Sequence, residues 1–141
     1  MINVLADKYL YNLESHIPDN VNLRRYDPSA GIPAELDNVH ALLVRTTNEI
    51  NTKTLPNIPS SRKFIGTASA GSDHVDMDYL EKKGVTFTNA PGCNARSVAE
   101  YVTTALLLWS ETKKKHLSEY SVGIVGVGNV GTQVQQLHKK M

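Results

Sequence analysis

Three glycines near the end of the chain impose the strongest constraint on its fold. They form the pattern Gly126-x-Gly128-x-x-Gly131, directly after the apolar run SVGIV at residues 121–125. Apolar side chains follow at helical spacing, at Val130, Val134 and Leu137. In a strand–turn–helix, such glycines permit a tight turn, close approach of a pyrophosphate and close packing of helix on strand. The pattern therefore predicts a nucleotide-binding turn, although glycine-rich turns without a ligand share it.

The composition is typical of a globular protein with one domain, or with one domain and part of another. The chain has 141 residues, of which 40% are hydrophobic, and a formal net charge of +1. Near-neutral charge gives no preference for nucleic acid or for an anionic membrane, so neither is expected as a partner. A single cysteine, no apparent signal peptide and only short apolar runs predict a cytoplasmic protein. No His, Cys, Asp or Glu group has metal-ligand spacing, so no metal is expected.

Short apolar runs alternate with helical patterns in the first part of the chain. Five segments are predicted as strands: Ile2–Leu5, Asn22–Tyr26, Ala41–Val44, Phe64–Gly66 and Val85–Thr88. Two segments are predicted as helices: Lys8–His16 and Ser72–Lys83, the second with polar caps at its start and Gly84 at its end. This alternation predicts an α/β fold with a mainly parallel sheet.

A turn-rich loop and a strongly apolar helix separate this region from the glycine turn. Ser97 and Glu100 match a capping box for the helix, which is predicted over residues 97–110. The helix is apolar on more than one face, so we expect it to pack against material on two sides. The predicted organisation is a domain at 1–95, a helix and linker at 96–116, and the start of a second domain at 117–141.

Polar residues directly follow two of the predicted strands. Arg45, Thr46 and Thr47 follow the third strand, and the run GTASAG, which contains Thr67, follows the fourth. Ligands bind at the carboxyl ends of strands in open parallel sheets, and a guanidinium pairs well with carboxylate or phosphate. These residues fit a site for an anionic, oxygen-rich ligand. The alternative, which spacing alone favours, is that the hydroxyl residues form turns and Arg45 is a surface charge.

Longer motifs carry a resemblance to a known family. GTASAGSDHVD at 66–76, APGCNA at 90–95, VAEYV at 98–102 and VGIVGVGNVG at 122–131 together resemble the D-isomer specific 2-hydroxyacid dehydrogenases. The resemblance extends over the whole chain. It implies a flavodoxin-like substrate domain, followed by the first strand–turn–helix of a Rossmann domain that binds NAD.

The resemblance also assigns roles to residues by motif position. Thr46 and Thr67, with Arg45, would contact a phosphorylated hydroxyacid substrate. Five residues of the glycine turn would receive NAD: Gly126, Gly128, Asn129, Val130 and Gly131. The full-length form would be a homodimer, and the Arg, Glu and His that perform the chemistry in the family would lie beyond residue 141.

No catalytic residue is assigned within the chain. The five histidines are interpreted as non-catalytic, with His74 in a capping or surface position, and Cys93 as a small loop residue. We expect an incomplete family member that is inactive alone and marginally stable, because its last strand would lack a sheet neighbour. The alternative from another functional class is a stand-alone flavodoxin-like binding or regulatory module with a vestigial glycine turn.

Overall fold

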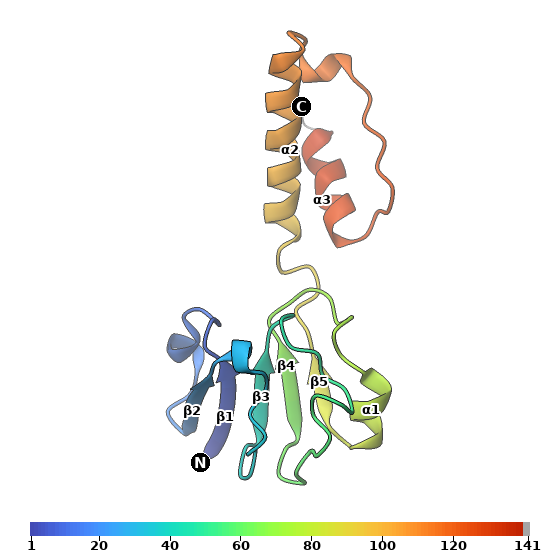
Figure 1. Ribbon diagram of the computed structural model, residues 1–141. Coiled ribbons are helices and arrows are strands. Elements are labelled where there is room, and N and C mark those ends of the chain that lie inside the picture. Colours follow the sequence, from blue (N-terminus) through green and yellow to red (C-terminus); the bar gives the residue numbers. More distant parts are fainter. Residues whose placement is uncertain (140–141) are drawn as a thin grey trace. The chain divides into compact units, whose positions relative to one another are not determined.

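The computed structural model describes residues 1–139, which fall into two compact units (Figure 1). The first unit ends at Ala90 and the second begins at Pro91. This division lies ahead of the predicted boundary at residue 95 and places the long apolar helix in the second unit.

A five-stranded parallel sheet forms the centre of the first unit (Figure 1). Its strands are β1 (Ile2–Asp7), β2 (Val21–Tyr26), β3 (Ala41–Val44), β4 (Phe64–Thr67) and β5 (Thr86–Thr88). They lie in the order β2-β1-β3-β4-β5, and every pairing is parallel. This is the flavodoxin-like order, in which the chain reverses its direction across the sheet between β1 and β3. The predicted parallel α/β fold and its flavodoxin-like class are confirmed.

The core of the first unit lies on one face of the sheet. In β3, Leu42 and Val44 are fully buried, whereas the alternate residues Ala41 and Leu43 are half-buried, as the pleat of a strand requires. Helix α1 (Met77–Lys82) lies beside β5 and contributes its buried side chains to the same cluster (Figure 1). This packing holds the strand ends in place.

Helix α1 begins at Met77 and not at the predicted Ser72. The side chain of Asp76 caps it by accepting a hydrogen bond from an amide of the first turn. The preceding residues are not helical because Val75 forms a parallel bridge with Ile50. A tertiary contact therefore overrides the local helical pattern.

Two further predictions for the first unit have different outcomes. The predicted helix Lys8–His16 is reduced to one 3-10 turn, η1 (Leu13–His16). Gly84 does follow α1 with a positive φ of 64°, the left-handed conformation that favours glycine after a helix.

The second unit contains α2 (Ala95–Thr112), a 3-10 turn η3 (Leu117–Glu119) and α3 (Asn129–His138) (Figure 1). The predicted capping box is wrong, because α2 begins ahead of Ser97 and its cap, Asn94, makes no side-chain bond. Glu100 instead accepts a hydrogen bond from Arg96 Nε at 2.8 Å. This i,i+4 ion pair engages Glu100 in place of the predicted cap.

Residues 121–125 do not form the predicted strand. All paired strands within residues 1–139 belong to the first unit, so this segment has no neighbour with which to form a ladder. Val122 and Val125 are exposed as a result. The segment connects η3 to α3 without regular structure.

Helix α2 packs against α3 on one side and exposes apolar residues on another. Ala99 is fully buried and Val134 of α3 is nearly so, whereas Tyr101, Leu108 and Trp109 are exposed. The ring of Trp109 lies against that of Tyr120, with 4.8 Å between their centres, so the second unit covers Trp109 only in part. The packing of α2 on two sides stays a prediction. No helix among residues 1–139 is long and apolar enough to cross a membrane.

Arg62 is the most unusual buried residue of the first unit. It is 1% exposed, and its Nε and both Nη atoms have no hydrogen-bond partner. Burial lowers the pKa of its guanidinium. An unpaired buried charge costs free energy, because the guanidinium gives up its hydration and gains no protein acceptor.

We predict that Arg62→Met stabilises the first unit by about 1–3 kcal/mol, because it replaces an unpaired cation with an apolar chain of similar length. Urea unfolding measures the change. The control is Arg24→Met, which alters an exposed arginine on β2 and should change stability by less than about 0.5 kcal/mol. A loss of stability in Arg62→Met would contradict this account.

Candidate functional site

The predicted substrate residues lie together at the carboxyl edge of the sheet. Val44 at the end of β3 is the register partner of Thr67 at the end of β4. Arg45 and Thr46 therefore leave the sheet beside Thr67. Parallel sheets bind ligands at this edge, and most often at the reversal of strand order, which here lies between β1 and β3. Their role in substrate binding stays a prediction.

Asp7 is the residue of this site that sequence reasoning missed. It ends β1, is fully buried, and accepts a hydrogen bond from Arg45 Nε at 2.9 Å. Its second carboxylate oxygen accepts a bond from the Tyr9 amide at 2.8 Å. No local pattern predicts this pair, because the two residues are far apart in sequence and meet only through sheet order.

The pairing with Asp7 fixes the orientation of the Arg45 guanidinium. Its Nε is engaged, its Cζ lies 5.0 Å from the centre of the Tyr9 ring, and its side chain is 34% exposed. Among the described residues, its two Nη groups have no protein acceptor. A guanidinium held in this way presents a planar pair of donors to a carboxylate or phosphate.

Further charges surround this pair. Lys8 forms an ion pair with Asp27, and the hydrogen bond from Lys8 lowers the pKa of the Asp27 carboxyl to about 2. Lys8 also lies over the Tyr9 ring, with its Nζ 4.9 Å from the ring centre. Burial, with the nearby Asp7 carboxylate, raises the pKa of the Tyr26 phenol far above its ordinary value. Tyr26 therefore stays neutral next to the ion pair.

Backbone bonds tie the loops of the site to one another. The Ile50 amide donates to the His74 carbonyl at 2.8 Å, which joins the loop after β3 to the loop after β4. The Ala90 amide donates to the Ser69 carbonyl at 2.9 Å, which joins the segment after β5 to the same loop. The polar residues of the site therefore lie on short connections that are held at several points.

His74 belongs to this site and not to a helix cap. The predicted capping position is wrong, because α1 begins after it. Its Nε2 lies 3.1 Å from Thr67 Oγ1, which in turn lies 2.8 Å from Ser69 Oγ. Thr67 is 5% exposed, and the other two side chains are half-buried. The only sequence signal for this contact is that the three residues share one strand-end loop.

The glycine turn of the second unit leaves backbone amides and open space at the start of α3. Helix α3 begins at Asn129, directly after Gly128, and no side chain caps its first amides. A Cβ on Gly128 would have no neighbour within 4 Å, so the space beside it is open. Gly126 has a positive φ of 89°, and a Cβ on Gly131 would lie 2.1 Å from the Gly126 carbonyl oxygen. Free amides, open space and the positive end of α3 fit a pyrophosphate.

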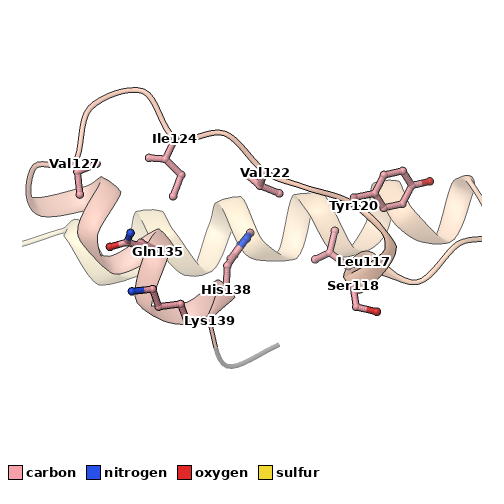
Figure 2. A pocket seen from close by; sticks show the side chains of 9 residues that line it. All are labelled: Leu117, Ser118, Tyr120, Val122, Ile124, Val127, Gln135, His138 and Lys139. Carbon is pink, nitrogen blue, oxygen red and sulfur yellow. The ribbon is translucent and has the colours of Figure 1, made fainter.

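A cavity of about 540 Å³ lies between η3, the irregular segment before the glycine turn, and α3 (Figure 2). Its lining is largely apolar from Val122, Ile124 and Val127, with His138 and Lys139 on the α3 side. None of the five predicted cofactor residues lines it. Val127, which lies between the first two glycines of the turn, does line it. No group of three His, Cys, Asp or Glu in the described part of the chain could hold a metal ion.

Comparison with known proteins identifies one family. The family model described as D-isomer specific 2-hydroxyacid dehydrogenase, catalytic domain, matches residues 3–135. Erythronate-4-phosphate dehydrogenase of Cronobacter sakazakii is 50% identical over 109 residues, which are 77% of this chain and 28% of the relative. The enzyme of the same name from Psychromonas ingrahamii is 37% identical over 96% of this chain and 35% of the relative. The chain thus spans about a third of the length of these relatives.

Solved structures share the fold at lower identity. D-lactate dehydrogenase from Aquifex aeolicus, complexed with NAD and lactic acid, matches with a TM-score of 0.67 at 21% identity. The match covers 98% of this chain and 48% of that one. A D-isomer specific 2-hydroxyacid dehydrogenase from Polaromonas gives a TM-score of 0.70 at 19% identity, over 99% of this chain and 52% of that one.

We predict strong energetic coupling between Asp7 and Arg45. Removing either partner leaves the other charge unpaired at least in part, so a double-mutant cycle with Asp7→Leu and Arg45→Met should give about 1–3 kcal/mol of coupling. Urea unfolding measures each corner of the cycle. The control cycle on the exposed Arg96–Glu100 pair should give less than about 0.5 kcal/mol. Equal coupling in the two cycles would argue against a buried, structure-forming pair.

Proposed function

This chain belongs to the family of D-isomer specific 2-hydroxyacid dehydrogenases, and we propose that it provides the substrate-binding edge and the first NAD-binding turn of such an oxidoreductase. The proposed reaction moves a hydride from C2 of a hydroxyacid to NAD and releases a proton, leaving a 2-oxoacid and reduced NAD. The observation that carries the proposal is the Asp7–Arg45 pair at the reversal of strand order.

In this proposal, Arg45 binds an anionic group of the substrate through its Nη groups. Thr46 is exposed in the turn directly after Arg45, so its hydroxyl is available to the same ligand. Thr67 lies at the neighbouring strand end and contacts another oxygen of the ligand. A bidentate guanidinium with adjacent hydroxyls suits a small molecule that carries carboxylate, phosphate and hydroxyl groups.

When bound, NAD supplies the hydride acceptor. The amides of Asn129, Val130 and Gly131 would hold its pyrophosphate, with Gly126 and Gly128 providing the turn and the open approach. Among residues 1–139, no side chain is assigned as the base for the hydroxyl proton. We therefore expect the chain alone to bind its ligands without turning them over.

We propose 4-phospho-D-erythronate as the substrate, oxidised in the biosynthesis of pyridoxine. Support comes from the name shared by relatives at 37–51% identity and from the two anionic ends that this compound would bring to the site. The alternative is another phosphorylated hydroxyacid, such as 3-phosphoglycerate. Assembly as a homodimer and a location in the cytoplasm complete the proposal.

We predict that 4-phosphoerythronate binds to the chain more tightly than 3-phosphoglycerate. Arg45→Met should weaken this binding at least tenfold, because a hydrogen bond to a charged group contributes roughly 1.5–3 kcal/mol. Isothermal titration calorimetry measures both effects. Arg45→Lys keeps a cation beside Asp7 and controls for folding, and Arg24→Met controls for net charge. Tighter binding of 3-phosphoglycerate would favour the alternative substrate, and unchanged binding by Arg45→Met would contradict the proposed site.

We predict that NAD binds to the chain and that Gly128→Val weakens this binding at least tenfold. A Cβ at Gly128 meets no atom within 4 Å, so the side chain extends into open space beside the turn and the helix content should not change. Calorimetry and circular dichroism measure the two quantities. The control is Gly123→Ala, where a Cβ also meets no atom within 4 Å. No NAD binding by the unaltered chain would favour the stand-alone module with a vestigial turn.

A further inference from the structure

Three polar side chains form a continuous line of hydrogen bonds at the end of β4 and in the loop that follows it. His74 Nε2 lies 3.1 Å from Thr67 Oγ1, and Thr67 Oγ1 lies 2.8 Å from Ser69 Oγ. Ser69 Oγ donates to the Gly71 carbonyl at 2.9 Å. The line therefore begins at an imidazole and ends on a backbone oxygen, which fixes its direction.

The direction follows from counting protons. A carbonyl oxygen can only accept, so the single hydroxyl proton of Ser69 is used on Gly71. Thr67 must then donate its own proton to Ser69, because Ser69 has none left to give. His74 must in turn donate from Nε2 to Thr67, whose proton is already used. The neutral imidazole that satisfies the whole line carries its proton on Nε2.

This arrangement limits what a ligand can do here. The hydroxyls of Thr67 and Ser69 each keep a lone pair, but neither has a free proton. Either oxygen can accept a hydrogen bond from a ligand, and neither can donate one. A ligand hydroxyl is a good partner for such a site, whereas a carboxylate or phosphate oxygen would meet only lone pairs.

We propose that His74 is a positioning residue that makes Thr67 and Ser69 an acceptor site for a hydroxyl of the substrate. The inference rests on the proposed function and assigns different groups of the ligand to different residues of that site. Arg45 binds an anionic end of the ligand, and the Thr67–Ser69 pair selects for a hydroxyl group beside it. The site thereby discriminates between a hydroxyacid and an anion of the same size without hydroxyls.

The backbone around His74 suits this role. Its carbonyl accepts the Ile50 amide at 2.8 Å, and the Asp76 amide donates to the Ile50 carbonyl at 2.8 Å. The next residue, Val75, pairs with Ile50 in the isolated bridge. These bonds anchor the backbone at His74 and directly after it, so the ring is held against Thr67 independently of any ligand.

The tautomer of His74 tests the direction of the line without a ligand. Long-range ¹H–¹⁵N correlation spectra of the full chain at alkaline pH should show neutral His74 with its proton on Nε2. His74→Gln identifies the signal among the five histidines. A proton on Nδ1 would leave Nε2 as an acceptor and would overturn the proposal. Because no ligand is present, this result is independent of the proposed function.

Ligand selectivity tests whether the Thr67–Ser69 pair selects for a hydroxyl group. Calorimetry compares 4-phosphoerythronate with 4-phosphobutyrate, which keeps both anionic ends and lacks both hydroxyls. The unaltered chain should bind 4-phosphoerythronate more tightly. Ser69→Ala frees the Thr67 proton for anionic oxygens, so the ratio of the two dissociation constants should fall about fivefold, in large part through tighter binding of 4-phosphobutyrate.

Thr46→Val is the matched control, because it removes a hydroxyl outside the line and should weaken both ligands alike. A fall in both affinities by the same factor in Ser69→Ala would show a merely structural role and would overturn the proposal. Failure of the unaltered chain to bind either ligand would contradict the proposed function, and the His74 tautomer would still decide the present inference.

Discussion

The ion pair between Asp7 and Arg45 is the constraint on which the candidate site depends. A fully buried carboxylate is stable only when it is paired, and Arg45 Nε and the Tyr9 amide provide that pairing. The strand order places the ends of β1 and β3 next to each other, so the two charges can meet. The guanidinium is then held with its remaining donors available. One interaction thus ties β1 to the residue after β3 and orients a guanidinium at this edge of the sheet.

The rest of the site is arranged around that fixed point. The register of β3 and β4 brings Thr67 beside the residue that precedes Arg45, and the Ile50–Val75 bridge joins the two following loops. His74 is carried by the second of these loops. The proposed division between an anion-binding side and a hydroxyl-accepting side therefore follows from the register of the sheet and the bridge between the two loops. The glycine turn is organised differently, because its free amides and the close approach at Gly131 arise within a few residues.

This difference explains how much could be predicted from the sequence. The strands and the parallel sheet depend on local patterns, and those predictions agree with the structure except for residues 121–125, which lack a strand neighbour. The glycine turn also depends on a local pattern, and α3 begins there as expected, while its binding of NAD stays a prediction. The strand-end positions of Arg45 and Thr67 were also predictable from the apolar runs. Arg45 directly follows one such run, and Thr67 ends the next. The role of Asp7 was not predictable, because its partner Arg45 is distant in the sequence. The local pattern places His74 in a capping or surface position of a helix. It misses the contact with Thr67, because the bridge at Val75 that delays α1 is a tertiary contact.

The central claim is that an anionic hydroxyacid binds at the carboxyl edge of β1, β3 and β4. The most direct test is a titration of the ¹⁵N-labelled chain with 4-phosphoerythronate, followed by chemical-shift changes of backbone amides and of the Arg45 Nε. Binding at this edge should give the largest changes at Arg45, Thr46 and residues 67–69, with smaller changes at Tyr9. Changes centred on the basic stretch at residues 113–115, or on any other surface remote from Arg45, would contradict it.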